Sequence, residues 1–212
     1  MLEKTIKALQ EMDAAVIQAD AVKKRTFEYI NANYRSKSEL MNQKIEEMNN
    51  AYTATCESAA EKVRDVLEVE IQDAKNKIDA VVCAAVPPTF SEDLNVIHAR
   101  QGKMSDYEVE LYVNKYLHNY PATAALNAAL AKDYAMIRMM RIVKPEKLIE
   151  ELDQRKGEVL RLINSYDPTG YVARFLRTES NPIANMAARI QAFVDGNFMV
   201  DKNVAVLGAI PV

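Results

Sequence analysis

The chain has 212 residues, of which 49% are hydrophobic and 27% charged, and its length is about one and a half typical domains. With only five Gly and seven Pro, the composition argues against an all-β fold with many tight turns and against glycine-dependent nucleotide-binding folds. The 27 basic and 30 acidic residues leave a net charge of −3, so a broad phosphate-binding surface is not favoured.

Residues 1–86 contain neither Gly nor Pro. Since these residues destabilise a helix interior by about 1 and 3 kcal/mol respectively, their absence predicts a long helical segment. From Cys56 to Ala85 the apolar residues recur in steps of three or four, which indicates a narrow coiled-coil seam that needs a partner helix. We expect oligomerisation through an apolar stripe that includes Ile45, Met48, Tyr52, Val63, Leu67, Ile71 and Ile78.

The stretch from Asn31 to Glu39 decides whether this segment is one rod or a helical hairpin. It is rich in weak helix formers, and Ser36 with Glu39 has the spacing of a capping box from which a second helix would start. A continuous rod would be about 130 Å long, whereas a hairpin would have arms of about 50 and 70 Å. We favour the break, and the sequence leaves both arrangements open.

Pro87 and Pro88 end the long segment, because a proline pair cannot continue a helix. Residues 87–196 then show shorter segments with apolar residues at helical spacing, and most of these segments are preceded by a polar cap or a proline. This pattern predicts a compact bundle of five or six helices. The expected fold class is therefore all-α. These helices are expected to start at Ser91 (ending near Arg100), at Ser105 with Glu108 as capping box, near Pro121 (continuing through Val143), at Pro145, at Asp167–Pro168 and at Asn181–Pro182 (ending near Gly196).

Residues 197–212 form an apolar C-terminal tail with a different pattern. Phe198–Val200 and Val204–Leu207 are β-prone and are separated by a turn signal, which would allow a short β-hairpin. The last three residues are apolar, whereas most termini are polar and frayed. We expect the tail to dock on its own bundle or on a neighbouring subunit through Phe198, Val206, Leu207, Ile210 and Val212.

Candidate catalytic and metal-binding residues are few. His98 and His118 lie on different expected helices, and a site that joins them to Glu108 or Glu110 is the weaker interpretation beside ordinary surface or capping roles. Cys56 and Cys83 lack any metal-ligand spacing and are interpreted as free thiols. We therefore predict no enzyme, no cofactor and no metal site.

Basic residues are concentrated between Lys132 and Arg177. If Arg138, Arg141 and Lys144 share a helix face, as their three-residue spacing indicates, they would offer contacts to phosphate. Acidic residues are interleaved from Glu146 onward, which favours a mixed, salt-bridged surface instead. A dimeric nucleic-acid-binding regulator is thus the alternative hypothesis and not the favoured one.

In overall layout the chain resembles the structural and assembly proteins of tailed-phage particles. The resemblance consists of a long helix without Gly or Pro, a small helical body and an apolar C-terminal tail. Phage scaffolds often end in a strongly basic module, which this chain lacks, so the resemblance implies a minor virion component. No stretch of 18 apolar residues occurs, and no secretion signal is evident in the N-terminal residues. We expect a non-enzymatic homo-oligomer that contacts other structural proteins and no membrane, located in the cytoplasm or in a virion assembled there.

Overall fold

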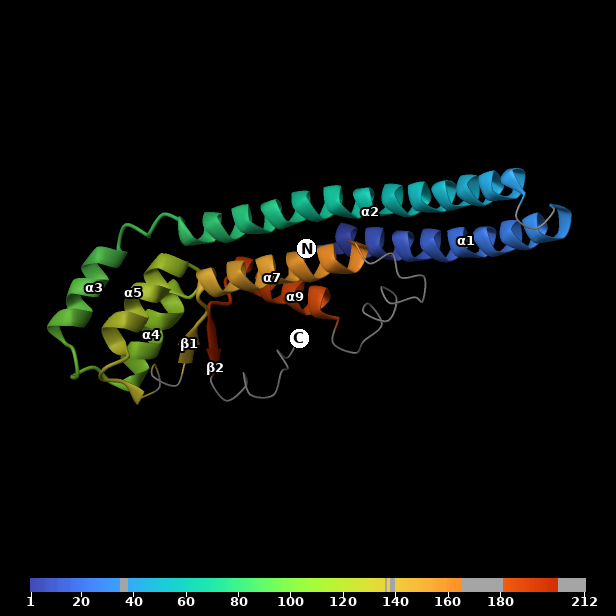
Figure 1. Ribbon diagram of the computed structural model, residues 1–212. Coiled ribbons are helices and arrows are strands. Elements are labelled where there is room, and N and C mark those ends of the chain that lie inside the picture. The colour runs from blue at the N-terminus through green and yellow to red at the C-terminus, as the bar shows by residue number, and fades with distance from the viewer. Residues whose placement is uncertain (35–37, 136, 138–139, 165–180, 202–212) are drawn as a thin grey trace. The chain divides into compact units, whose positions relative to one another are not determined.

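The computed structural model describes residues 1–34, 38–135, 137, 140–164 and 181–201 (Figure 1). This part of the chain is mostly helical, which confirms the all-α prediction. The elements in chain order are α1 (Glu3–Asn33), α2 (Glu39–Val82), α3 (Phe90–Ala99), α4 (Asp106–Tyr116), α5 (Tyr120–Leu130), β1 (Met140–Ile142), α7 (Pro145–Asn164), α9 (Pro182–Val194) and β2 (Met199–Asp201).

The chain divides into two compact units, each built from two stretches of sequence. Unit 1 comprises Met1–Gln72 and Leu152–Ala187, and unit 2 comprises Asp73–Glu151 and Ala188–Val212. Helices α2, α7 and α9 each contribute residues to both units. Three consecutive segments were expected from the sequence, residues 1–86, 87–196 and 197–212. That division stays a prediction.

In unit 1, α1 and the first part of α2 form an antiparallel hairpin (Figure 1). Helix α1 ends at Asn33 and α2 begins at Glu39, so the favoured break is confirmed and the continuous rod is wrong. The hydroxyl of Ser38 accepts a hydrogen bond from the Met41 amide at 3.1 Å and caps the start of α2. Ser36, which was expected to provide this cap, lies outside the described residues.

Two contacts far apart along the hairpin fix its register. The Thr5 hydroxyl donates a hydrogen bond to a Glu70 carboxylate oxygen at 2.7 Å, and the Lys23 ammonium lies 4.5 Å from the centroid of the Tyr52 ring. A move of 18 residues forward along α1 therefore matches a move of 18 residues back along α2. The register of the two helices is therefore the same at both contacts.

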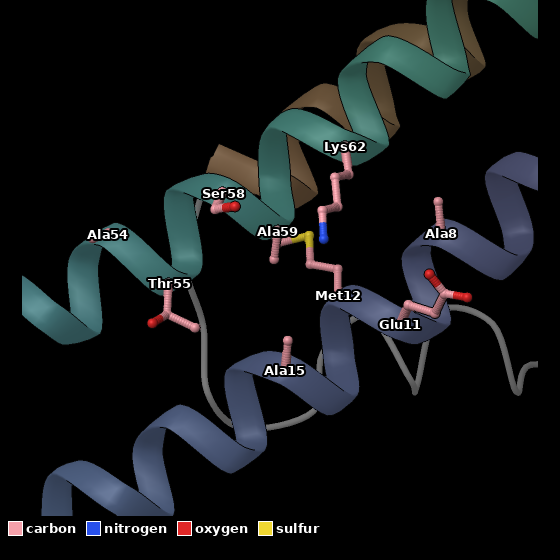
Figure 2. A pocket seen from close by; sticks show the side chains of 9 residues that line it. All are labelled: Ala8, Glu11, Met12, Ala15, Ala54, Thr55, Ser58, Ala59 and Lys62. Carbon is pink, nitrogen blue, oxygen red and sulfur yellow. The ribbon is translucent and has the colours of Figure 1, made fainter.

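The seam predicted on α2 is a buried face of this single chain. In unit 1 its residues Cys56, Ala60, Val63, Leu67 and Ile71 are all buried. Helix α1 contributes a matching buried face that steps by three and four, as expected for helices packed along their length. Its members include Leu9, Met12 and Val16, of which Met12 points toward α2 in Figure 2.

The unit 1 part of α7 packs against α2 on another side. Arg64 of α2 donates a hydrogen bond to the side-chain carbonyl of Asn164 at 2.8 Å, and Lys156 forms an ion pair with Glu68 of α2. Val159 of α7 is buried. The partner helices that the seam was expected to need are thus supplied within the chain.

Unit 2 contains a closed apolar core built from short helices. Phe90 at the start of α3 meets Tyr116 of α4 edge to face, with ring centroids 4.9 Å apart. Ile97, Val109 and Leu126 of α3, α4 and α5 belong to the same buried cluster. Their convergence from three consecutive helices confirms the compact helical packing expected for this part of the chain.

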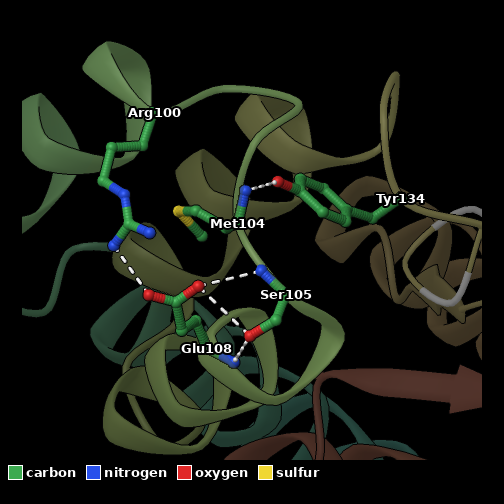
Figure 3. Close-up of polar contacts among 5 residues, drawn as sticks. All are labelled: Arg100, Met104, Ser105, Glu108 and Tyr134. Carbon is green, nitrogen blue, oxygen red and sulfur yellow. Dashed lines mark hydrogen bonds and ion pairs between the residues drawn. The ribbon is translucent and has the colours of Figure 1, made fainter.

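The helix starts in unit 2 follow local signals in most cases. Ser105 accepts a hydrogen bond from the Glu108 amide, and the Glu108 carboxylate accepts one from the Ser105 amide at 2.8 Å, which confirms the predicted capping box (Figure 3). Asn119 caps α5 ahead of Pro121. At α3 the prediction was wrong, because the N-cap is Thr89 and not Ser91, and it has no side-chain cap bond.

The helix expected from Pro121 through Val143 is also wrong at its C-terminal end. Helix α5 ends at Leu130, whose carbonyl accepts hydrogen bonds from the amides of Asp133 and Tyr134 in a tight turn. The Tyr134 hydroxyl then accepts a hydrogen bond from the Met104 amide at 2.9 Å (Figure 3). These contacts end α5, Ala135 and Ile137 are helical again, and the chain becomes extended at Met140, where β1 begins.

Strands β1 and β2 form a two-stranded antiparallel sheet in unit 2, with Arg141 opposite Val200. Strand β2 coincides with the first β-prone segment of the tail, but its partner β1 was expected to be helical. The second β-prone segment, Val204–Leu207, lies outside the described residues. Next to the sheet, the rings of Tyr120, Phe193 and Phe198 make edge contacts with centroids 5.2 to 5.4 Å apart.

Within the described ranges, no helix combines the length and the apolar character needed to cross a membrane.

Candidate functional site

The seam residues predicted for oligomerisation fall into two groups. Val63, Leu67, Ile71 and Ile78 are buried within the chain, with at most 3% of each exposed. They are already covered, so a second copy could reach them only if the chain rearranged. The other three, Ile45, Met48 and Tyr52, lie nearer the hairpin connection and are only partly buried.

The residues predicted for tail docking are largely outside the described part. Val206, Leu207, Ile210 and Val212 all lie beyond residue 201. Phe198 is 1% exposed and belongs to the aromatic cluster with Tyr120 and Phe193. Its side chain therefore contributes to the core of unit 2.

The three basic residues of the alternative hypothesis do not share a helix face. Arg141 lies in β1, and Lys144 is exposed in the connection between β1 and α7. Arg138 lies outside the described residues. The three-residue spacing suggested one helical face, but the chain leaves the helical conformation before Arg141, so that argument fails.

Glu108, one of the two carboxylates considered with the histidines, has other partners. Glu108 is committed to the capping box and to Arg100, which donates a hydrogen bond to it at 2.7 Å. The hydrogen bond from the Ser105 amide, followed by that from Arg100, lowers the pKa of Glu108 below its usual value. His98 and His118 are both exposed. Among the residues that the structure describes, no group of three His, Cys, Asp or Glu side chains could hold a metal ion.

A groove lies between α1 and α2 in unit 1. It consists of two adjoining hollows of about 410 and 420 Å³, and both are lined by Ala15 and Thr55. We refer to this surface, from Ala8 to Thr26 on α1 and from Met48 to Lys62 on α2, as the groove. Because the two hollows share residues, they form one continuous surface along the hairpin.

The floor of the groove is made mostly of small side chains. Small residues let the backbone of another helix approach closely, so such a surface suits helix packing better than it suits a polar ligand. Tyr52 adds larger apolar surface within it, whereas Met12 lies at its floor and is almost fully buried. The alanines that line the groove are Ala8, Ala15, Ala19, Ala51, Ala54 and Ala59.

Three charged side chains lie along the groove. Glu11 stands on α1 and Lys62 extends from α2 on the other side, as Figure 2 shows. Lys23 lies over the Tyr52 ring nearer the connection. Glu11 also lies 3.9 Å from Lys7 in an exposed ion pair one turn away. The groove thus carries one acidic and one basic group facing each other near one end.

Helix α7 leaves this groove open. It contacts α2 through Arg64 and Glu68, whereas Lys62 lines the groove. Successive residues are rotated by about 100° around a helix axis, so Arg64 and Lys62 point about 200° apart. The groove and the α7 contact therefore occupy nearly opposite sides of α2.

Large apolar side chains are exposed in the part of the hairpin nearest its connection. Ile17, Val22, Phe27, Tyr29 and Leu40 are each between 45% and 61% exposed. Scattered exposed apolar residues are ordinary, but a concentration of large ones marks an interaction surface. These five side chains are therefore available to another protein surface, although on α1 they point in different directions, with Ile17 and Val22 about 140° apart around the helix axis.

The groove was missed by the sequence analysis because its lining residues are mostly alanines. Ala8, Ala15, Ala19 and Val22 follow one another in steps of seven, four and three, which places them on one helix side. This period was visible in the sequence. The larger apolar residues have a stronger period, and they mark the buried face.

Comparison of the chain with protein-family models, with curated proteins and with solved structures finds no match in any of the three.

Proposed function

We propose that this protein is a non-enzymatic structural or assembly protein that forms oligomers through its N-terminal helical hairpin. The observation that carries the proposal is the exposure of Ile17, Val22, Phe27, Tyr29 and Leu40 on a long, in-register hairpin. Exposed apolar surface of this kind is stabilised when another protein surface covers it.

The hairpin also has the mechanical properties that an assembly element needs. Helices of 31 and 44 residues are about 46 and 66 Å long. The contacts of Thr5 with Glu70 and of Lys23 with Tyr52 hold the helices in one register. A hairpin of this kind presents its surface groups at fixed spacing to a neighbouring subunit.

The finer proposal is that the assembly is a tailed-phage particle, in which the protein is a minor virion component. It is supported by the layout of a long helical hairpin followed by a small helical unit and an apolar tail. The proposal predicts that mass spectrometry detects the chain in purified particles of the phage that encodes it. Its absence from such particles would remove the virion role and leave the oligomer proposal standing.

The mass of the full chain in solution tests the oligomer proposal. Light scattering coupled to gel filtration should give at least twice the monomer mass of 23.9 kDa, with a share of oligomer that rises with concentration. Replacing Val22 and Tyr29 by Ser should lower that share, because both side chains are exposed and apolar. A compact monomer at every concentration would contradict the proposal.

A further inference from the structure

We propose that the groove between α1 and α2 is the contact surface for a second copy of this chain. The two hairpins would lie face to face, related by a two-fold axis that runs along the groove. This inference rests on the proposed function and specifies the partner and the contact surface.

The steric fit follows from the side chains of the groove. A two-fold rotation about an axis parallel to the helices keeps every residue at its level and places α1 of one copy over α2 of the other. The neighbouring helices then run antiparallel, as in a four-helix bundle. Ala15 meets the level of Ala59 in the second copy, so small residues oppose small residues where the backbones come closest.

Charge complementarity supports a second copy as the partner. The register set by Thr5 and Glu70 places Glu11 within about two residues, or about 3 Å, of the level of Lys62. Rotation about the groove axis therefore brings Glu11 of each copy next to Lys62 of the other. The arrangement forms two equivalent ion pairs, one on each side of the axis.

The remaining charge of the groove is compatible with this arrangement. Lys23 is at the level of Tyr52, over whose ring it already lies. The rotation brings Tyr52 of the second copy to the same level. Lys23 therefore comes level with a second aromatic ring, with which a cation interacts favourably, while Lys23 of the second copy lies at the same level on the diagonally opposite helix.

The size of the groove approaches that of a standard protein interface. The nineteen residues of α1 from Ala8 to Thr26 extend about 27 Å, and two adjacent helices present a width of about 20 Å. The flat area is then about 540 Å² per partner, about two thirds of the ~800 Å² that a standard interface buries on each side. The exposed Val22 at the groove edge adds to this area.

The test is a set of charge reversals in the full chain, measured by sedimentation equilibrium. Glu11→Lys and Lys62→Glu each place like charges together twice per pair, so each should raise the dissociation constant on the order of 100-fold. The double variant restores opposite charges and should return to within about tenfold of the original value. Circular dichroism verifies that each variant is helical.

Matched controls reverse a charge elsewhere on the same helices. Glu28 of α1 and Glu57 of α2 are exposed and point away from the groove by helix geometry. Glu28→Lys and Glu57→Lys should change the dissociation constant by less than about threefold. The unmodified chain gives a second readout that needs no variant, because its association should weaken as salt screens the two ion pairs.

The outcomes separate this inference from the proposed function. Suppose that the chain forms oligomers while the charge reversals change the dissociation constant no more than the controls do, or while the double variant does not restore it. In either case the groove is not the contact surface, and the oligomer proposal survives. If the unmodified chain is a monomer at all concentrations, both are overturned.

Discussion

The hairpin of unit 1 and the helical core of unit 2 achieve stability in different ways. Helices α3, α4 and α5 are 10 or 11 residues long and converge on one buried cluster. Helices α1 and α2 are three to four times longer and bury one face each. A short helix must be stopped by local signals and covered from several sides, whereas a long hairpin repeats one contact and leaves a side open.

The difference is visible at the starts of the helices. In unit 2, α4 is capped by Ser105, a residue adjacent to it in sequence. In unit 1, α1 follows Leu2, which has a left-handed backbone and provides no side-chain cap. Its first amides are satisfied by Glu70, which accepts hydrogen bonds from Lys4 N at 3.3 Å and Thr5 N at 2.8 Å. The start of α1 is therefore capped by a residue distant in sequence, whereas the start of α4 is capped by a residue adjacent to it in sequence.

The largest predicted effect contrasts one leucine from each unit. Leu126 is 2% exposed in the core of unit 2, and Leu40 is 52% exposed in the hairpin. Leu126→Ala should lower the free energy of unfolding by about 3 kcal/mol, whereas Leu40→Ala should change it by less than about 0.5 kcal/mol. Urea unfolding followed by circular dichroism measures both. An equal loss of unfolding free energy in the two variants would show that Leu40 is packed as tightly as Leu126.

The second prediction concerns the long-range cap of α1. Glu70→Ala removes the acceptor of three hydrogen bonds and leaves the buried Thr5 hydroxyl unsatisfied, which should cost about 2 kcal/mol. Hydrogen exchange at the first turn of α1 should accelerate accordingly. Glu68→Ala, which removes an exposed ion pair two residues away from Glu70, should cost less than about 1 kcal/mol. Unchanged exchange in Glu70→Ala would refute the capping role.

The third prediction tests local capping in unit 2. Ser105→Ala removes the capping-box acceptor and should destabilise α4 by about 1 kcal/mol. Ser91 was expected to cap α3 but lies inside that helix, so Ser91→Ala should change the stability by only a few tenths of a kcal/mol. Amide exchange in the two helices distinguishes these outcomes. A comparable loss in both variants would contradict the cap assignment.

The smallest effect is a pH dependence in unit 2. Lys115 and the Tyr116 hydroxyl both donate hydrogen bonds to Asp93 at 2.5 Å, and these two bonds, Lys115 first, lower the pKa of Asp93. Because the pKa of Asp93 is lower in the folded state, the ionised carboxylate stabilises the fold at pH values above its unfolded-state pKa of about 3.9. This stabilisation is lost as the pH falls through the folded-state pKa. Asp93→Asn should flatten the loss of stability below about pH 4. Acid unfolding curves that coincide for both proteins would contradict this.

Features that depend on neighbouring residues were predictable from the sequence. The capping box of Ser105, the start of α7 at Pro145 and the start of α9 at Pro182 all rest on groups within four residues of each other. The buried seam on α2 was predictable because its period is repeated over many turns. The break before Glu39 was favoured for the same local reasons.

Features that depend on distant residues were not predictable in this way. The segment from Met140 to Ile142 forms β1 because it pairs with β2, almost sixty residues further along the chain. The helices that cover the seam are α1 and α7, and a seam pattern does not distinguish a partner in the same chain from one in another copy. The alanine period on α1 was present in the sequence, but only the register of the hairpin brings Glu11 to within about two residues of the level of Lys62.

Disulfide cross-linking between copies tests the central claim most directly. Ala15→Cys and Ala59→Cys are made in separate chains that also carry Cys83→Ser, which removes the exposed native thiol. In an equal mixture under mild oxidation, we expect a disulfide-linked dimer that joins one chain of each kind, because α1 of one copy faces α2 of the other. A mixture with no more cross-linked dimer than either variant alone would contradict the face-to-face pairing of hairpins.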